Sequence, residues 1–249
     1  MKDAITISQF FENYKSIRNQ AGKALAEDAQ RKLPDFFRAF SVIHQQILAE
    51  KKRDSPDYNL FHILRIRHLE TVTHTPFLVN LLNPEGSHAQ GDLFLRFFLQ
   101  KVVGFGNSGQ FRLQELKENK HAQSLGFMDI FLRFESDKKQ YALVIENKLY
   151  AGDQPEQLKR YFDYCKNVMG YADEQIKILY LTIDGKIPTN QSYKQIAVDF
   201  ASLSGKSVLT LAGYKKEIAA WLEECSQFLP HQGKLYFSLQ QYLQTIRYL

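Results

Sequence analysis

Apolar residues recur at three- and four-residue spacing through the first part of the chain, which is the pattern of amphipathic helices. The pattern covers residues 5–17 (ITISQFFENYKSI) and residues 33–48 (LPDFFRAFSVIHQQIL). A polar break at 51–57 follows, where Pro56 disfavours helix at Ser55. Another helix is predicted from Asn59. Residues 1–58 contain no recognisable catalytic constellation and are predicted to form an N-terminal helical accessory segment.

From Glu70 onwards, helical patterns alternate with short runs of strand length. Asp153 and Glu156 have the spacing of a capping box, which predicts that a helix starts there. Strands alternating with helices favour the α/β class. The predicted helices are 74–84, 91–103, 153–169, 213–229 and 234–249. The predicted strands are 111–117, 127–134, 141–149, 176–184 and 195–200.

Composition limits the class of protein. A chain of 249 residues with 44% hydrophobic and 24% charged residues has room for a sizeable core and is not typical of a disordered chain. Cys165 and Cys225 lie far apart, which disfavours a disulfide scaffold and fits a reducing, cytoplasmic setting. The start resembles no secretory signal, and no run approaches a membrane span. The net charge of +5 is compatible with a polyanionic partner.

Two adjacent predicted strands contain charged residues in otherwise apolar surroundings. In YALVIENKL, Glu146 and Lys148 are two residues apart and therefore project from one face of the strand, with Asn147 on the other. Asp129 interrupts the apolar strand FMDIFLRF. If the hairpin between them is symmetric about Asp137 and Lys138, facing residue numbers sum to 275, and Asp129 faces Glu146. Facing carboxylates destabilise a sheet unless a cation lies between them, so the pattern predicts a divalent metal beside Lys148.

These residues identify a resemblance to a known family. Asp129, then Glu146-Asn147-Lys148, then a helix with Gln157 and Tyr161 resemble the PD-(D/E)xK nuclease superfamily. The Gln-x-x-x-Tyr helix is similar to that of RecB-type nucleases. Segments 74–99, 179–188 and 214–222 resemble an uncharacterised bacterial branch, and the resemblance runs from about Asn59 to Phe228. Met128 stands where the name-giving proline would be.

The acidic-x-Lys pattern has little value without its context. It also occurs at 50–52, 115–117, 118–120, 137–139 and 184–186. Only the copy at 146–148 ends an apolar strand, has an acidic residue in the strand before it and precedes the Gln157–Tyr161 helix.

The resemblance implies a restriction-endonuclease-like three-layer α/β core over residues 59–249, with a mixed central sheet flanked by helices. It implies a Mg²⁺- or Mn²⁺-dependent nuclease in which Asp129 and Glu146 hold the metal. Lys148 would orient the attacking water, help to deprotonate it and stabilise negative charge. Gln157 and Tyr161 would brace the site or contact the DNA backbone. DNA is the preferred substrate over RNA, and a homodimer is compatible because many such nucleases pair.

A further acidic residue is usual in this superfamily. Glu70 is the candidate, with Glu115 and Glu118 as competitors. No histidine pair has zinc-ligand spacing, so His74 and His88 are interpreted as structural residues. Basic residues at 31–32, 51–53, 65–67 and 159–160 are either a phosphate-tracking surface or ordinary solvated charges. The alternative function is a module that binds nucleic acid or protein on a nuclease fold without cutting.

Overall fold

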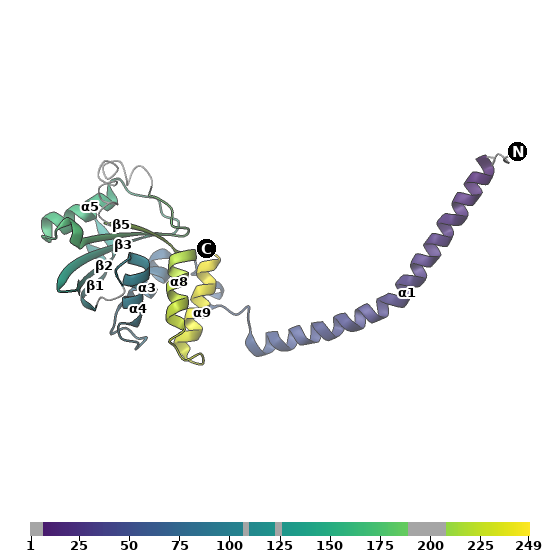
Figure 1. Ribbon diagram of the computed structural model, residues 1–249, viewed down its shortest axis with the longest axis horizontal. Helices are drawn as coiled ribbons and strands as arrows, with labels where there is room; N and C mark the ends of the chain where they lie inside the picture. Colours follow the sequence, from purple (N-terminus) through teal and green to yellow (C-terminus); the bar gives the residue numbers. More distant parts are fainter. Residues whose placement is uncertain (1–6, 107–109, 123–125, 189–207) are drawn as a thin grey trace. The chain divides into compact units, whose positions relative to one another are not determined.

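The computed structural model describes residues 7–106, 110–122, 126–188 and 208–249. The chain divides into two compact units, Met1–Tyr58 and Asn59–Leu249 (Figure 1). Nearly all of the first unit is one helix, α1 (Ile7–Asp54), where the apolar pattern predicted two shorter ones. The intervening segment 18–32 is rich in Ala, Lys, Gln and Arg, which favour helix, and Asp28 forms ion pairs with Arg31 and Lys32.

The second unit is built around a five-stranded mixed sheet in the order β1-β2-β3-β4-β5 (Figure 1). The first three strands are antiparallel neighbours, whereas β4 runs parallel to β3 and β5 runs parallel to β4. The strands are β1 (Phe111–His121), β2 (Phe127–Ser136), β3 (Lys139–Lys148), β4 (Ile176–Thr182) and β5 (Leu209–Gly213).

The β2–β3 hairpin has the predicted register. Its pairs run from Ile130–Ile145 to Ser136–Lys139, and each pair of residue numbers sums to 275. The turn residues Asp137 and Lys138 have φ of 51° and 63°, the left-handed conformation of a tight two-residue hairpin turn. A slip of one residue would turn every side chain of β3 to the opposite face, so this register decides which side chains reach the site.

Helices cover both faces of the sheet (Figure 1). One face packs on a core that includes Leu143 and Ile145 of β3, and the other on a core that includes Val144 and Phe131. The first face is covered by α3 (Thr75–Leu82), α4 (Leu93–Phe98), η2 (Leu99–Val103), η6 (Tyr214–Ile218), α8 (Ala219–Ser226) and α9 (Lys234–Arg247). The π-helical turn η1 (Glu70–His74) directly precedes α3. The second is covered by α5 (Gln157–Asp163) and η4 (Tyr164–Val168). Short elements α2 (Leu60–Ile63) and η5 (Asp173–Gln175) complete the unit.

This arrangement confirms the predicted α/β class with a mixed sheet flanked by helices. Several elements on the first face join a π-helical turn directly to an α-helix, as η1 joins α3. In the described part of the chain, no helix combines the length and the apolar character that a membrane span requires. The strand predicted at 195–200 lies outside the described residues.

The predicted capping box at the start of α5 is wrong. The helix begins at Gln157, and Glu156 adopts a left-handed conformation with φ of 54° just before it. Asp153 instead accepts a hydrogen bond of 2.6 Å from the hydroxyl of Tyr180 on β4. The Asp153 carboxylate therefore binds a hydroxyl group from a distant strand, and the spacing of residues near Asp153 does not predict this contact.

Candidate active site

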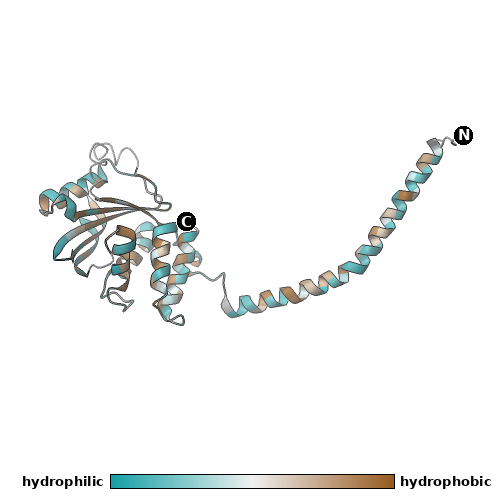
Figure 2. Cartoon of the chain, in the orientation of Figure 1, coloured by the Kyte–Doolittle hydropathy of each residue, from teal (hydrophilic) through white to brown (hydrophobic). Residues whose placement is uncertain are grey.

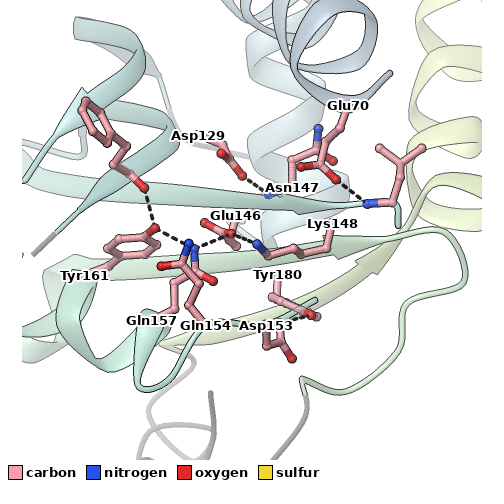
Figure 3. Close-up of polar contacts among 12 residues, drawn as sticks. Glu70, Asp129, Glu146, Asn147, Lys148, Asp153, Gln154, Gln157, Tyr161 and Tyr180 are labelled. Atoms are coloured by element: carbon pink, nitrogen blue, oxygen red, sulfur yellow. Dashed lines mark hydrogen bonds and ion pairs between the residues drawn. The ribbon is translucent and has the colours of Figure 1, made fainter. Parts of the chain in front are cut away.

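Asp129, Glu146 and Lys148 meet where β2 and β3 run side by side (Figure 3). An Asp129 carboxylate oxygen accepts a hydrogen bond of 2.8 Å from the backbone N–H of Asn147. Lys148 Nζ lies 2.8 Å from Glu146 Oε1, and both side chains are at least nine-tenths buried. The side-chain alternation predicted for this strand is therefore present, with Glu146 and Lys148 on one face.

Glu146 is the most buried acid of the group, at 1% exposure. Its Oε1 accepts hydrogen bonds from Lys148 and from Gln157 Nε2, at 2.8 Å each. Its Oε2 is buried and has no hydrogen-bond partner. Burial and the neighbouring Asp129 raise the pKa of Glu146 to about 8, and Lys148 only partly offsets them. A cation of higher charge than Lys148 would relieve both the burial cost and the unpaired oxygen.

The helix α5 supplies the two residues predicted from the Gln-x-x-x-Tyr spacing. Gln157 Nε2 donates to Glu146 Oε1 and also to the Tyr161 hydroxyl, at 2.9 Å. That hydroxyl donates to the backbone carbonyl of Phe127 at the start of β2. Both side chains are buried. The pair therefore links α5 to β2 and β3 beside Glu146, as Figure 3 shows.

Glu70 also reaches this region, from the π-helical turn η1 (Figure 3). One of its carboxylate oxygens accepts a hydrogen bond of 2.7 Å from the backbone N–H of Leu149. Burial raises the pKa of Glu70, the hydrogen bond from Leu149 partly offsets this rise, and the negative charge of Asp129 adds to it. The competing acids lie elsewhere: Glu115 pairs with Lys120 and Arg133, and Glu118 is exposed.

A second polar network lies behind β3 on its other face. Asn147 donates to the Thr75 hydroxyl at 3.0 Å and accepts from the Tyr214 hydroxyl at 2.9 Å. Tyr242 meets His74 Nδ1 at 2.8 Å, and the other ring nitrogen meets the Arg67 carbonyl at 2.8 Å. This network was missed from the sequence, because Asn147 is the variable position of the motif and its partners come from distant helices.

The histidines occupy structural positions, as predicted. His74 is fully buried, and burial lowers its pKa. His88 binds the Asn83 carbonyl at 2.8 Å and the backbone N–H of Gln90 at 3.0 Å, within one loop. Among the basic clusters, Arg31 and Lys32 are exposed and pair with Asp28, and Lys51 is exposed and pairs with Asp57.

The donor set fits a hard divalent cation. The described residues contain no group of three or more His, Cys, Asp or Glu side chains close enough to hold a metal by themselves. Mg²⁺ needs only one or two protein carboxylates, because waters and substrate oxygens complete its shell. Asp129 and the unpartnered Oε2 of Glu146 supply such a pair, with Glu70 nearby.

Comparison with known proteins gives one family. A model described as the PD-(D/E)XK nuclease superfamily matches residues 58–244, which span β1 to β5 and every residue of the site. Searches of curated proteins and of solved structures give no significant match.

Proposed function

The chain belongs to the PD-(D/E)XK nuclease superfamily, and from this premise we propose that it is a metal-dependent nuclease that hydrolyses phosphodiester bonds of DNA. The observation that carries the proposal is the buried, unpartnered Oε2 of Glu146 beside Asp129 and Lys148. Burial of an unpaired carboxylate oxygen lowers the stability of the fold if the residue has only a structural role. A bound divalent cation would provide the missing partner for this oxygen.

Asp129 and Glu146 are the residues that would hold Mg²⁺ or Mn²⁺, with Glu70 as a further acid near them. When bound, the metal ion would polarise a phosphoryl oxygen and lower the pKa of a coordinated water. The backbone N–H of Asn147 fixes the Asp129 carboxylate, and Gln157 fixes the Glu146 carboxylate. Both acids are therefore held in place before a ligand arrives.

Lys148 is the residue proposed to act on the attacking water and the developing charge. Burial lowers its pKa, but Glu146 and Asp129 outweigh this, so the pKa is raised overall and the side chain is an ammonium. Its N–H groups can orient a water and stabilise negative charge on the phosphorane-like transition state. Gln157 and Tyr161 are proposed to brace this site through Glu146 and the Phe127 carbonyl.

The test is nuclease activity of the purified chain on double- and single-stranded DNA, with RNA in parallel. We expect cleavage with Mg²⁺ or Mn²⁺, none with a chelator, and a loss of at least about 100-fold in Asp129→Asn, Glu146→Gln and Lys148→Ala. Glu115→Gln is the matched control, since Glu115 belongs to another acidic-x-Lys copy and lies in ion pairs on β1. Full activity in Lys148→Ala would contradict the proposed role.

Metal titration separates this proposal from a module that binds without cutting. A nuclease with this site should show a Mg²⁺-linked rise in Tm that Glu146→Gln removes. A Tm that does not respond to Mg²⁺ or Mn²⁺, together with DNA binding, would favour the binding module.

The two cysteines are free and buried, which supports a reducing compartment, and we propose the cytoplasm.

A further inference from the structure

The helix α1 exposes a long series of large apolar side chains. Hydrophobic residues recur along α1 in Figure 2. Six aromatic residues on this helix are between 55% and 61% exposed: Phe10, Phe11, Tyr14, Phe36, Phe37 and Phe40. Aliphatic residues of the same kind are Ile17, Leu25, Leu33, Ile43 and Ile47. A helix of 48 residues with this much apolar surface needs a packing partner, because most helix stability in proteins comes from burial of an apolar face.

These residues have a symmetric order about Leu25. Towards the N-terminus the sequence places Ala21, Ile17, Tyr14 and Phe10 at steps of four, four, three and four. Towards the C-terminus it places Ala29, Leu33, Phe36 and Phe40 at the same steps. We call these nine residues the Leu25-centred stripe. Each position has a partner of similar size at equal distance on the other side.

We propose that the Leu25-centred stripe is the contact between two copies of this chain, whose α1 helices pair antiparallel about a two-fold axis near Leu25. In this pairing, facing residue numbers sum to 50. Phe10 then faces Phe40, Tyr14 faces Phe36, and Ile17 faces Leu33, so that large side chains meet large ones. Ala21 faces Ala29, which brings the two backbones close near the axis. A two-fold contact of this kind is self-complementary and closed.

The available area is sufficient for a stable dimer. An aromatic side chain can bury about 200 Å², so the four in the stripe, each more than half exposed, offer roughly 450–500 Å² per chain. The aliphatic members of the stripe, with the exposed Phe11, Ile43 and Ile47 next to it on the helix, bring the total near the roughly 800 Å² per partner that stable interfaces bury.

Charge favours the antiparallel orientation. The last turn of α1 contains Lys51, Lys52 and Arg53. A parallel pair would bring six cationic side chains together at one end, whereas an antiparallel pair separates the two clusters and aligns the helix dipoles favourably. Lys32, which lies near the stripe, has its charge balanced by Asp28 at 2.9 Å.

Sedimentation of the full chain is the first test. We expect the wild-type chain to sediment as a species of twice 29.0 kDa at micromolar concentration. The double variant Phe36→Ser/Phe40→Ser should raise the Kd of the dimer at least tenfold and shift the chain towards the monomer. Val42→Ser is the matched control, because Val42 is exposed and lies about 200° around the helix from Phe40. A monomeric wild-type chain would overturn the proposal and would mean that α1 packs on its own chain or on another partner. An equal effect of Val42→Ser on the Kd would also overturn it.

Cysteine cross-linking tests orientation and register. Ala21→Cys and Ala29→Cys are mild changes, and the native Cys165 and Cys225 are buried. Under oxidation we expect a disulfide only in the mixture of the two variants, since their numbers sum to 50. Equivalent positions lie eight residues, or about 12 Å, apart along the antiparallel pair, too far for a disulfide. A disulfide formed by Ala21→Cys alone would mean parallel pairing and would refute the antiparallel contact.

Discussion

The surroundings of the Glu146 carboxyl group disfavour its ionised form. It is almost fully buried and lies near Asp129, and one of its oxygens has no partner. Lys148 and Gln157 both bind the other oxygen. The free energy of unfolding should therefore depend on pH even when no substrate is present.

We predict that the metal-free chain loses stability as pH rises from about 5 to 8. Burial raises the pKa of Glu146 to about 8 in the folded chain, whereas in the unfolded chain the pKa has its ordinary value of 4.5. The folded state therefore binds more protons in this window, and the free energy of unfolding falls with rising pH, by at most about 5 kcal/mol from this group. Urea unfolding at pH 5, 6, 7 and 8 in a chelator measures the fall.

Two comparisons identify the group responsible. Glu146→Gln should flatten the pH dependence, whereas Glu115→Gln should leave it unchanged, because Glu115 lies in ion pairs on β1. Mg²⁺ should restore stability at pH 8, since it favours the ionised carboxylate. An equal pH dependence in Glu146→Gln and the wild type would assign the effect to another group.

At the scale of residues, the sequence predicted much of this group because alternation along a strand and hairpin symmetry are local rules. Asp129, Glu146 and Lys148 follow from those rules, and the register they require is observed. The unpartnered Oε2 of Glu146 depends on what packs over it from α5, and no local rule contains that information.

At the scale of elements, α5 is hydrogen-bonded to the start of β2 and to the end of β3. Gln157 binds Glu146 and Tyr161, and Tyr161 binds the Phe127 carbonyl. Gln157→Ala should weaken Mg²⁺ affinity or cleavage by about 10–100-fold, the usual cost of losing a residue that orients a metal ligand. Isothermal titration with Mg²⁺ and the cleavage rate check this. Lys159→Ala on the same helix is the control, because Lys159 pairs with Asp163; an equal loss there would indicate a general effect on α5.

The network behind β3 joins two further elements to the motif. Asn147 is bound by Thr75, the first residue of α3, and by Tyr214 of η6. Asn147→Ala should lower the free energy of unfolding by about 1–3 kcal/mol, because it removes one hydrogen-bond partner from each of two buried hydroxyl groups. It should also lower the cleavage rate, since η1 with Glu70 directly precedes α3.

Chemical denaturation of Asn147→Ala is best compared with Asn80→Ala, an amide whose bond to Ser87 is exposed. Equal stability of the two variants would mean that the network around Asn147 does not stabilise the fold. Sequence patterns predicted the helices that supply Thr75 and Tyr214, because amphipathic periodicity is local. They did not predict which helix packs behind which strand, because that is settled by packing between distant segments.

At the scale of the whole molecule, the boundary between the two units falls beside a residue with a firm structural role. Asn59 is fully buried, and its side-chain oxygen accepts from the backbone N–H groups of Phe61 and His62. Its amide donates to the Gln241 carbonyl at 2.8 Å and to Gln244 at 2.9 Å, on α9. We therefore propose that the nuclease-like domain begins at Asn59, as the sequence suggested, and that residues 1–58 are an accessory segment.

A chain that starts at Tyr58 should separate the two proposals about this protein. The polar caps and cores of 59–249 are complete without α1, so we expect the shortened chain to keep the wild-type Tm, its Mg²⁺-linked rise and its cleavage rate per chain. Because the Leu25-centred stripe is removed, sedimentation should show a monomer. Asn59→Ala in the same shortened chain should cost about 1–2 kcal/mol, since it removes the cap of α2. A shortened chain that still dimerises would place the contact on the nuclease-like domain, whereas an inactive but folded monomer would show that α1 contributes to cleavage.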